Sequence, residues 1–121
     1  MSQHWALMWN VKPGTEQQVQ ELFADYESPD PIVKDADGNV KGELLSTQVY
    51  IKGNTVVRVM EVEGSFPDVA AHLGRQPGIQ ELERKLDPLL ETARDMSTPE
   101  GAREFFIGSM MQCLLARKAG E

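Results

Sequence analysis

Large apolar residues dominate the first stretch of the chain, residues 4–12 (HWALMWNVK). Tryptophan, leucine and valine suit the pleated surface of a sheet, so this stretch is expected to be a strand that ends at Pro13–Gly14. Because successive side chains of a strand point to opposite faces, the odd-numbered residues share one face. That face carries Trp5, Leu7, Trp9 and Val11.

Two further strands are predicted over residues 43–52 and 55–63, because the Gly53–Asn54 pair between them is typical of a tight hairpin turn. The polar connector before them, residues 28–42, is expected to contain only a turn. Its DADGN run lacks the glycine and the glutamate that a calcium loop needs at its sixth and twelfth positions.

Three segments place apolar residues at helical spacing. The first follows Thr15, the second follows Ser65, and the third covers residues 79–89, with Glu83 expected among its outward-facing charges. Thr98 is expected to cap another short helix. The last element is expected over about residues 106–117; its start can still be helical, and residues 112–117 are expected to form a strand. The apolar helix positions are Val19, Leu22, Phe23, Tyr26, Val69, Ala70, Leu73, Ile79, Leu82, Leu86 and Leu89.

The resulting order is strand, helix, strand, strand, helix, strand, with extra helical turns before the last strand. This order predicts an α+β fold of the ferredoxin-like split βαβ type, with four antiparallel strands and both long helices on one face. Several strands carry apolar residues on both faces. The face without helices therefore needs a cover, and a second copy of the same sheet would supply it in a homodimer.

Composition limits the classes of partner. The chain has 121 residues, which suits a single domain over residues 1–121, and its formal net charge is −7. An acidic balance argues against nucleic acid or an anionic membrane as partner, because phosphate binding needs local positive charge. Cys113 is the only cysteine, so no internal disulfide is expected. The N-terminal residues lack the pattern of a signal peptide, and a cytoplasmic location is expected.

The sequence contains none of the short motifs that mark common cofactor sites or nucleophiles. Dinucleotide-binding GxGxxG, the phosphate-binding GxxxxGK[ST] loop, GxSxG and HExxH are all absent. His4 and His72 are the only histidines, so a metal site would have to rely mainly on carboxylates. We therefore expect no cofactor and no metal.

Three residues are candidates for acid–base or charge-stabilising chemistry. His72, near a helix end, can exchange a proton near neutral pH, and Arg75 three residues later can stabilise an enolate or bind a carboxylate. The alternative is that both simply interact with the last turn of their helix. Arg58 interrupts the apolar strand face that includes Met60, so it must face a cavity, a carboxylate or solvent.

A second group supplies surface for a flat ligand. Tryptophan stacks on planar molecules and methionine fills irregular space, although both are also ordinary core residues. Asp95 is either a turn residue or a carboxylate at the mouth of a cavity. Cys113 has no neighbouring histidine or basic residue that would activate it, so it is interpreted as a small apolar residue. The candidate substrate-binding residues are Trp5, Met8, Trp9, Met60 and Asp95.

The stretch VVRVMEVEGSFPDVAAHLGRQPGIQELERKL, followed by RDMSTPEGAREFF, resembles the SchA/CurD-like family of aromatic polyketide and spore-pigment gene clusters. The resemblance runs from ALMWNVKPGTE to the CLLARK end. The wider group is similar to small dimeric α+β barrel proteins, which include polyketide cyclases and cofactor-free monooxygenases. The resemblance implies a role in type II polyketide synthesis, with an aromatic polyketide intermediate and synthase components as partners.

Three functional hypotheses follow. A cyclase would use a base such as His72, with Arg58 or Arg75 stabilising the enolate of a poly-β-ketone. A cofactor-independent monooxygenase would deprotonate an electron-rich phenol or anthrone so that the substrate itself reacts with O₂. A non-catalytic accessory subunit would bind the synthase and protect the nascent chain. Of these we favour the cyclase.

Overall fold

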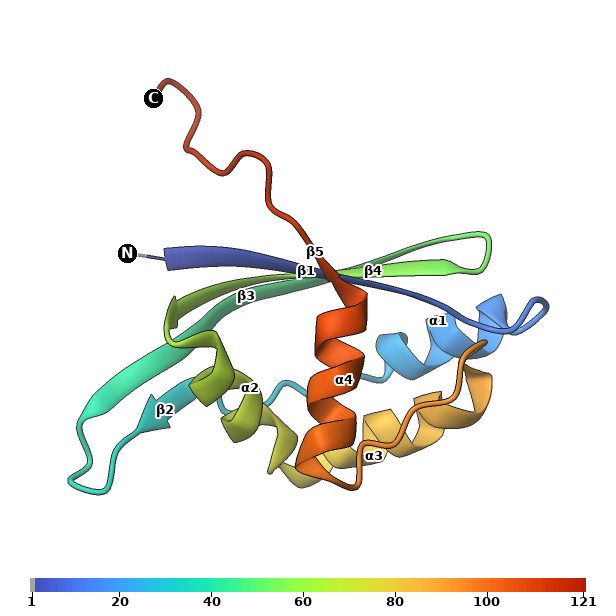
Figure 1. Cartoon of the computed structure of the whole chain (residues 1–121), viewed down its shortest axis with the longest axis horizontal. Helices are drawn as coiled ribbons and strands as arrows, with labels where there is room; N and C mark the ends of the chain where they lie inside the picture. Colours follow the sequence, from blue (N-terminus) through green and yellow to red (C-terminus); the bar gives the residue numbers. More distant parts are fainter. Residues whose placement is uncertain (1) are drawn as a thin grey trace.

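The structure is a computed structural model that describes residues 2–121. It consists of one antiparallel sheet with every helix on the same face (Figure 1). The strand order is β2-β3-β4-β1-β5. The elements are β1 (Ser2–Asn10), α1 (Glu16–Ala24), β2 (Ile32–Lys34), β3 (Val40–Lys52), β4 (Thr55–Gly64), α2 (Phe66–Gly74), α3 (Pro77–Leu86), η1 (Asp87–Leu89), α4 (Pro99–Ser109) and β5 (Met110–Met111).

This arrangement confirms the predicted α+β fold of the ferredoxin-like type. The strands β3, β4, β1 and β5 form the four-stranded core of the sheet, and β2 adds a fifth strand at one edge. α4 runs from the level of the other helices toward the sheet and continues directly into β5 (Figure 1). The C-terminal residues then leave on the side of the sheet that has no helices (Figure 1).

Strand register decides which side chains meet the helices. The odd-numbered residues of β1 lie opposite even-numbered residues of β4 and share the helix-covered face. The pairs are Trp5–Met60, Leu7–Arg58 and Trp9–Val56. The face assignment predicted for β1 agrees with this register.

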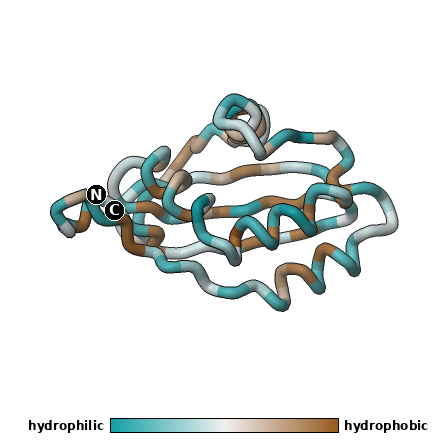
Figure 2. Tube along the Cα trace, turned by 90° about the horizontal axis from the view of Figure 1, so that it is seen from below, coloured by the Kyte–Doolittle hydropathy of each residue, from teal (hydrophilic) through white to brown (hydrophobic). Residues whose placement is uncertain are grey.

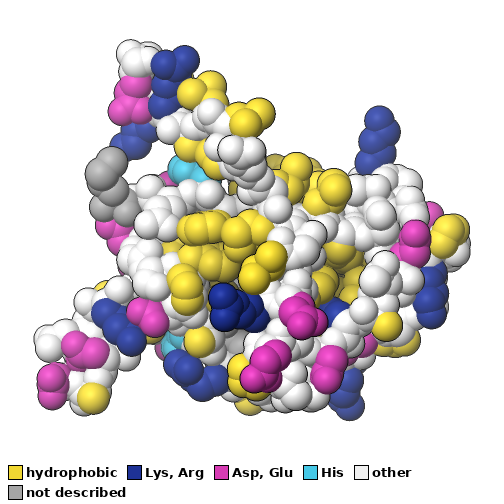
Figure 3. Space-filling view, in the orientation of Figure 1, with side chains coloured by type: hydrophobic (Ala, Val, Ile, Leu, Met, Phe, Trp, Pro, Cys, Tyr) yellow, Lys and Arg dark blue, Asp and Glu magenta, His cyan; other side chains and the backbone are white. Residues whose placement is uncertain are grey.

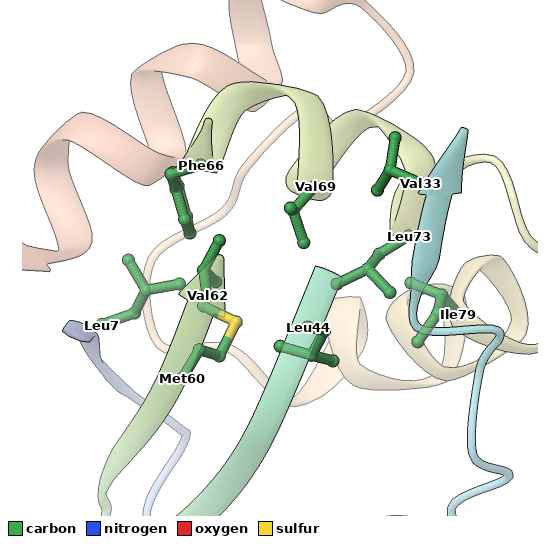
Figure 4. Close-up of a cluster of buried hydrophobic side chains, with 9 residues drawn as sticks. All are labelled: Leu7, Val33, Leu44, Met60, Val62, Phe66, Val69, Leu73 and Ile79. Carbon is green, nitrogen blue, oxygen red and sulfur yellow. The ribbon is translucent and has the colours of Figure 1, made fainter. Parts of the chain in front are cut away.

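The main hydrophobic core lies between this sheet face and α2. Leu7, Met60 and Val62 point from the strands toward Phe66 and Val69 of α2 (Figure 4). A second cluster under α1 and α3 is built on Val11, Val19, Val56, Leu86 and Leu90. Along the chain trace, hydrophobic and hydrophilic positions alternate on both the strands and the helices (Figure 2), as expected for elements buried on one face.

Local sequence signals explain several element boundaries. Gly53 in the β3–β4 hairpin has a positive φ of 59°, which favours glycine at this turn. The Ser65 side chain accepts a hydrogen bond from the backbone N–H of Asp68, and the Thr98 side chain accepts one from Gly101. Each of these two helices also has a proline in its first turn.

The structure corrects the prediction in two places. The connector over residues 28–42 contains β2, whose Val33 is buried against the core. The predicted last strand over residues 112–117 is wrong, because β5 comprises only Met110–Met111 and the following residues are not in a strand. α4 runs to Ser109, so the start of the last predicted element is helical, which is the alternative that the sequence left open.

Candidate functional site

Arg58 lies in the middle of β4, on the sheet face that the helices cover. Its strand partners are Leu7 on one side and Val49 on the other. Its Nε donates a hydrogen bond to Thr47 Oγ1 at 3.1 Å. Its Nη2 is buried and has no hydrogen-bond partner among residues 2–121. The strand therefore holds one end of the guanidinium and leaves the other end available.

Arg94 brings a second guanidinium from the segment between η1 and α4. Its side chain is only 6 % exposed, and its Nε donates a hydrogen bond to Asp87 Oδ1 at 2.8 Å. The guanidinium carbon lies 4.4 Å from the centre of the Phe105 ring, which is a cation–π geometry. Its Nη2 is also buried without a partner in the described part of the chain.

Glu83 on α3 places a carboxyl group near both guanidinium groups. Burial raises the pKa of this carboxyl from its ordinary value of 4.5. The positive charges of Arg94 and Arg58 act in the opposite direction, and the negative charge of Asp87 adds to the effect of burial. Glu83 is therefore partly buried and not on the outward face of α3, which corrects its predicted orientation.

Aromatic and apolar side chains lie beside these charges. Trp9 packs against Phe105 with ring centres 6.2 Å apart, and its buried Nε1 has no partner among residues 2–121. A recess of about 300 Å³ lies between α1 and the β3–β4 hairpin, and Val49, the strand partner of Arg58, contributes to its lining. Figure 3 shows hydrophobic side chains gathered in the middle of one face, with acidic and basic groups beside them.

Arg58, Glu83 and Arg94, together with Trp9, are called the polar cluster below. A carboxyl with a raised pKa can accept a proton from a carbon or oxygen acid, and guanidinium groups can stabilise the anion that remains. A groove of about 730 Å³ between α1 and α3 is lined by none of these four residues. We therefore place the candidate site at the polar cluster, where buried donors have no partner within the described residues 2–121.

His72 and Arg75 are placed at the C-terminal end of α2. His72 Nε2 lies 3.0 Å from the backbone oxygen of Asp30 and 3.8 Å from the Asp30 carboxylate. Arg75 is exposed at the end of the helix. No contact between His72 and the polar cluster is present among residues 2–121. The structure therefore does not bring the three predicted catalytic residues together.

The predicted substrate-binding residues divide between several locations. Trp9 belongs to the polar cluster, whereas Trp5 stacks on Phe66 with ring centres 4.6 Å apart, and Met60 is buried in the core. Met8 is on the opposite face of the sheet and is exposed.

Asp95 is exposed in the turn before α4. Hydrogen bonds from the side chain and the backbone N–H of Ser97 lower the pKa of its carboxyl. This role matches the turn alternative that the sequence left open.

Glu83 and Arg94 were not among the residues predicted from the sequence to form the site. The helical spacing contained a signal for Glu83, because it lies four residues after Ile79 and three before Leu86. Residues at these spacings lie at the edge of the apolar face of α3. Arg94 carried no periodic signal, since it lies in an irregular segment whose path depends on tertiary contacts. Among residues 2–121, no group of three or more His, Cys, Asp or Glu side chains is arranged to hold a metal ion.

The comparison with protein families gives a match over almost the whole chain. Residues 2–118 match the SchA/CurD like domain. The chain belongs to this family. The SchA/CurD-like domain described here contains no helix, in residues 2–121, that is long and apolar enough to cross a membrane.

Three relatives from Streptomyces are similar to this SchA/CurD-like domain. It is 41 % identical over 106 residues to the 42.8 kDa protein in the whiE locus of Streptomyces coelicolor, and the match covers 88 % of this chain and 25 % of that protein. It is 40 % identical over 106 residues to polyketide synthase CurD of Streptomyces cyaneus, with coverage of 88 % and 28 %. It is 35 % identical over 101 residues to protein SchA of Streptomyces halstedii, with coverage of 84 % and 25 %. The chain thus spans about a quarter of the length of these relatives.

The domain also resembles a solved structure, tetracenomycin F2 cyclase from Streptomyces glaucescens, which is described as a type-II polyketide cyclase. The TM-score is 0.58 at 11 % sequence identity, and the match covers 97 % of this chain and 98 % of that chain. At this identity the likeness shows the fold alone.

Proposed function

We propose that this domain acts in aromatic polyketide biosynthesis as a cyclase that closes and aromatises rings of a poly-β-ketone intermediate. Its membership of the SchA/CurD-like family and its similarity to a protein named polyketide synthase CurD support the pathway. The polar cluster supports the reaction. The observation on which the proposal depends is a carboxyl group with a raised pKa, Glu83, close to two guanidinium groups whose Nη2 atoms have no partner in residues 2–121.

The chemistry follows from the acidity of a CH₂ group between two carbonyls. The Glu83 carboxylate takes a proton from that carbon, and the guanidinium of Arg58 stabilises the enolate oxygen. The enolate carbon then forms a bond to a second carbonyl carbon of the same chain. The resulting alkoxide receives the proton back from Glu83, and loss of water gives the aromatic ring.

The surroundings of Glu83 suit this role. A raised pKa makes the carboxylate a stronger base, which brings it closer to the pH at which proton transfer is efficient. Apolar side chains such as Trp9 and Val49 limit water near the reacting groups and suit a flat product. The proposed catalytic groups are therefore Glu83 as base and Arg58 as the stabilising cation.

His72 as a general base, with Arg75 as its partner, remains a prediction from the sequence. In the structure His72 lies against Asp30, whereas Glu83 shares its environment with Arg58. Variants can separate the two assignments, because the residues are on different helices.

The test compares Glu83→Gln, Arg58→Gln and His72→Ala in a reaction that generates an uncyclised poly-β-ketone. We expect Glu83→Gln to lower the rate of ring formation at least about 100-fold, the scale of a lost general base. Glu81→Gln is the matched control, because Glu81 lies on the same helix but pairs with Arg84 and Lys85 at the surface.

Mass spectrometry of the products identifies the reaction. Cyclisation with aromatisation loses water, whereas a monooxygenase would incorporate label from ¹⁸O₂. The proposal fails if Glu83→Gln keeps the wild-type rate while His72→Ala loses it, or if the product carries ¹⁸O from O₂. Unchanged products with all three variants would favour the accessory role.

A further inference from the structure

Two hydrogen-bond donors pack against the same aromatic ring and lack acceptors. Arg94 lies over the Phe105 ring, and the indole of Trp9 lies beside it with an interplanar angle of 57°. Arg94 Nη2 and Trp9 Nε1 are both buried, and neither has a partner among residues 2–121. Buried donors are almost always paired, because an unpaired one carries a desolvation penalty of about 1–3 kcal/mol.

The position of Arg94 is held from two sides. Asp87 accepts the hydrogen bond from Nε, and the ring of Phe105 supports the face of the guanidinium. With only 6 % of its side chain exposed, Arg94 cannot satisfy Nη2 by extending into solvent. A guanidinium fixed in this way has a donor directed at a place where residues 2–121 supply no acceptor.

We propose that Arg94 and Trp9 form, beside Phe105, a recognition subsite for an anionic oxygen carried by a flat ring, such as a phenolate, an enolate or the carboxylate of an aromatic acid. The aromatic character of the ligand rests on the proposed function. The oxygen anion rests on the two unpaired donors, because a charge-assisted hydrogen bond from a guanidinium favours a negatively charged acceptor. Arg94 is thus a specificity-determining residue, and Asp87 is a positioning residue for it.

The local charges support an anionic ligand. The charged groups that act on Glu83 are Arg94, Arg58 from β4 and Asp87 from η1. With Glu83 ionised, the two positive and two negative charges cancel. Once Glu83 carries a proton, one positive charge is in excess, and a bound anion restores the balance. Binding of an anion and protonation of Glu83 therefore favour each other.

The binding experiment uses 2-naphthoate as probe and 2-naphthalenemethanol as its neutral counterpart, measured by titration calorimetry with the 121-residue chain. We expect 2-naphthoate to bind at least about tenfold tighter than the alcohol, because only the carboxylate forms charge-assisted hydrogen bonds. Arg94→Gln should remove most of this preference, and Trp9→Phe should reduce it. Arg84→Gln is the matched control, since it removes the same charge from an exposed position on α3.

A second measurement detects the proton that the protein takes up when 2-naphthoate binds. Titration in two buffers of different ionisation enthalpy should show uptake of a proton when 2-naphthoate binds, and the affinity should rise as pH falls toward the pKa of Glu83. Glu83→Gln carries a neutral amide in place of the carboxyl and should therefore lose the proton uptake. Asp87→Glu keeps the negative charge but displaces the carboxylate that holds Arg94 Nε, so it should weaken binding of 2-naphthoate without changing binding of the alcohol.

The outcomes separate this inference from the proposed function. Equal affinity for acid and alcohol, or unchanged affinity in Arg94→Gln, overturns the subsite even if Glu83→Gln abolishes cyclisation. Conversely, a normal rate of cyclisation in Glu83→Gln overturns the proposed function while the binding preference still stands. If Arg94→Gln loses its near-ultraviolet circular dichroism, Arg94→Lys supplies the same test: unchanged affinity for 2-naphthoate in that variant overturns the fixed guanidinium geometry.

Discussion

The buried carboxyl of Glu83 lowers the stability of the fold when it is ionised, and its raised pKa suits it to proton transfer. Burial raises the pKa of its carboxyl despite the nearby positive charges of Arg94 and Arg58. The folded state therefore binds a proton at this group more strongly than the unfolded state does. By linkage, the stability of the fold is highest when Glu83 is protonated, falls as pH rises through the folded pKa, and is constant above it.

The variant Glu83→Gln is therefore expected to be more stable than the wild type at pH 8, because the amide removes a buried carboxylate. The difference should shrink as pH is lowered toward 4.5, the ordinary pKa of the group, because the wild-type carboxyl becomes protonated on the way. Urea unfolding at several pH values measures both effects. Glu81→Gln, at an exposed position, should show no such dependence. A variant less stable than the wild type at pH 8 would contradict the interpretation of Glu83 as a buried carboxyl stabilised by protonation.

At the scale of the element, α4 depends on a tight contact at its first turn. A Cβ atom on Gly101 would lie only 1.8 Å from the backbone oxygen of Asp95. Gly101 also donates its backbone N–H to the Thr98 side chain, which caps the helix. The turn that carries Asp95 and the start of α4 therefore need glycine at this position. α4 in turn supplies the Phe105 ring, which contacts Trp9 and Arg94 of the polar cluster.

Gly101→Ala is expected to destabilise the fold by about 1–3 kcal/mol, because the backbone must move to relieve the overlap. Gly108→Ala in the same helix has open space around its Cβ position and should be neutral or stabilising by up to about 1 kcal/mol. Urea denaturation of both variants gives the comparison. Equal stabilities would show that the segment from Asp95 to Gly101 adapts freely and does not determine the position of α4.

Elements with strong local signals were predictable from the sequence. The β3–β4 hairpin follows from Gly53–Asn54, and the starts of α2 and α4 follow from the capping residues Ser65 and Thr98. The end of α4 was not predictable in this way, because residues 105–117 are apolar enough for a helix or a strand. β2 was missed because three residues in a polar connector become a strand only by pairing with β3.

The candidate site was less predictable, because it depends on tertiary contacts. Arg58 was identified because a charge in an apolar strand face needs an explanation. Glu83 and Arg94 come from α3 and from the segment after η1, and only the folded chain brings them near β4. His72 was a candidate only because an imidazole can exchange a proton near neutral pH, and the structure places it beside Asp30.

At the scale of the whole molecule, one face of the sheet has no helices over it (Figure 1). The strand register places Ala6 and Met8 of β1 on this face. Their partners on β4 are Val59 and Val57, and Tyr50 of β3 lies on the other side of Val57. Met8 is 46 % exposed and Tyr50 is 57 % exposed. The same face also carries polar side chains, such as His4 and Glu61, which lie 3.4 Å apart. The exposed apolar patch around Met8 and Tyr50 marks an interaction surface.

We expect a second copy to cover this face, so that the protein sediments as a dimer with twice the 13.5 kDa mass of one chain at micromolar concentration. Two sheets packed face to face bury their apolar residues on both sides of one interface.

Met8→Lys and Tyr50→Lys should give the mass of one chain, because each places a charge in that interface. Both residues are exposed in the single chain, so neither change should disturb its core. Ile107→Lys changes an equally exposed residue on α4 and should leave the dimer intact. A wild-type mass of one chain, or dissociation caused by Ile107→Lys alone, would place the contact elsewhere or exclude it.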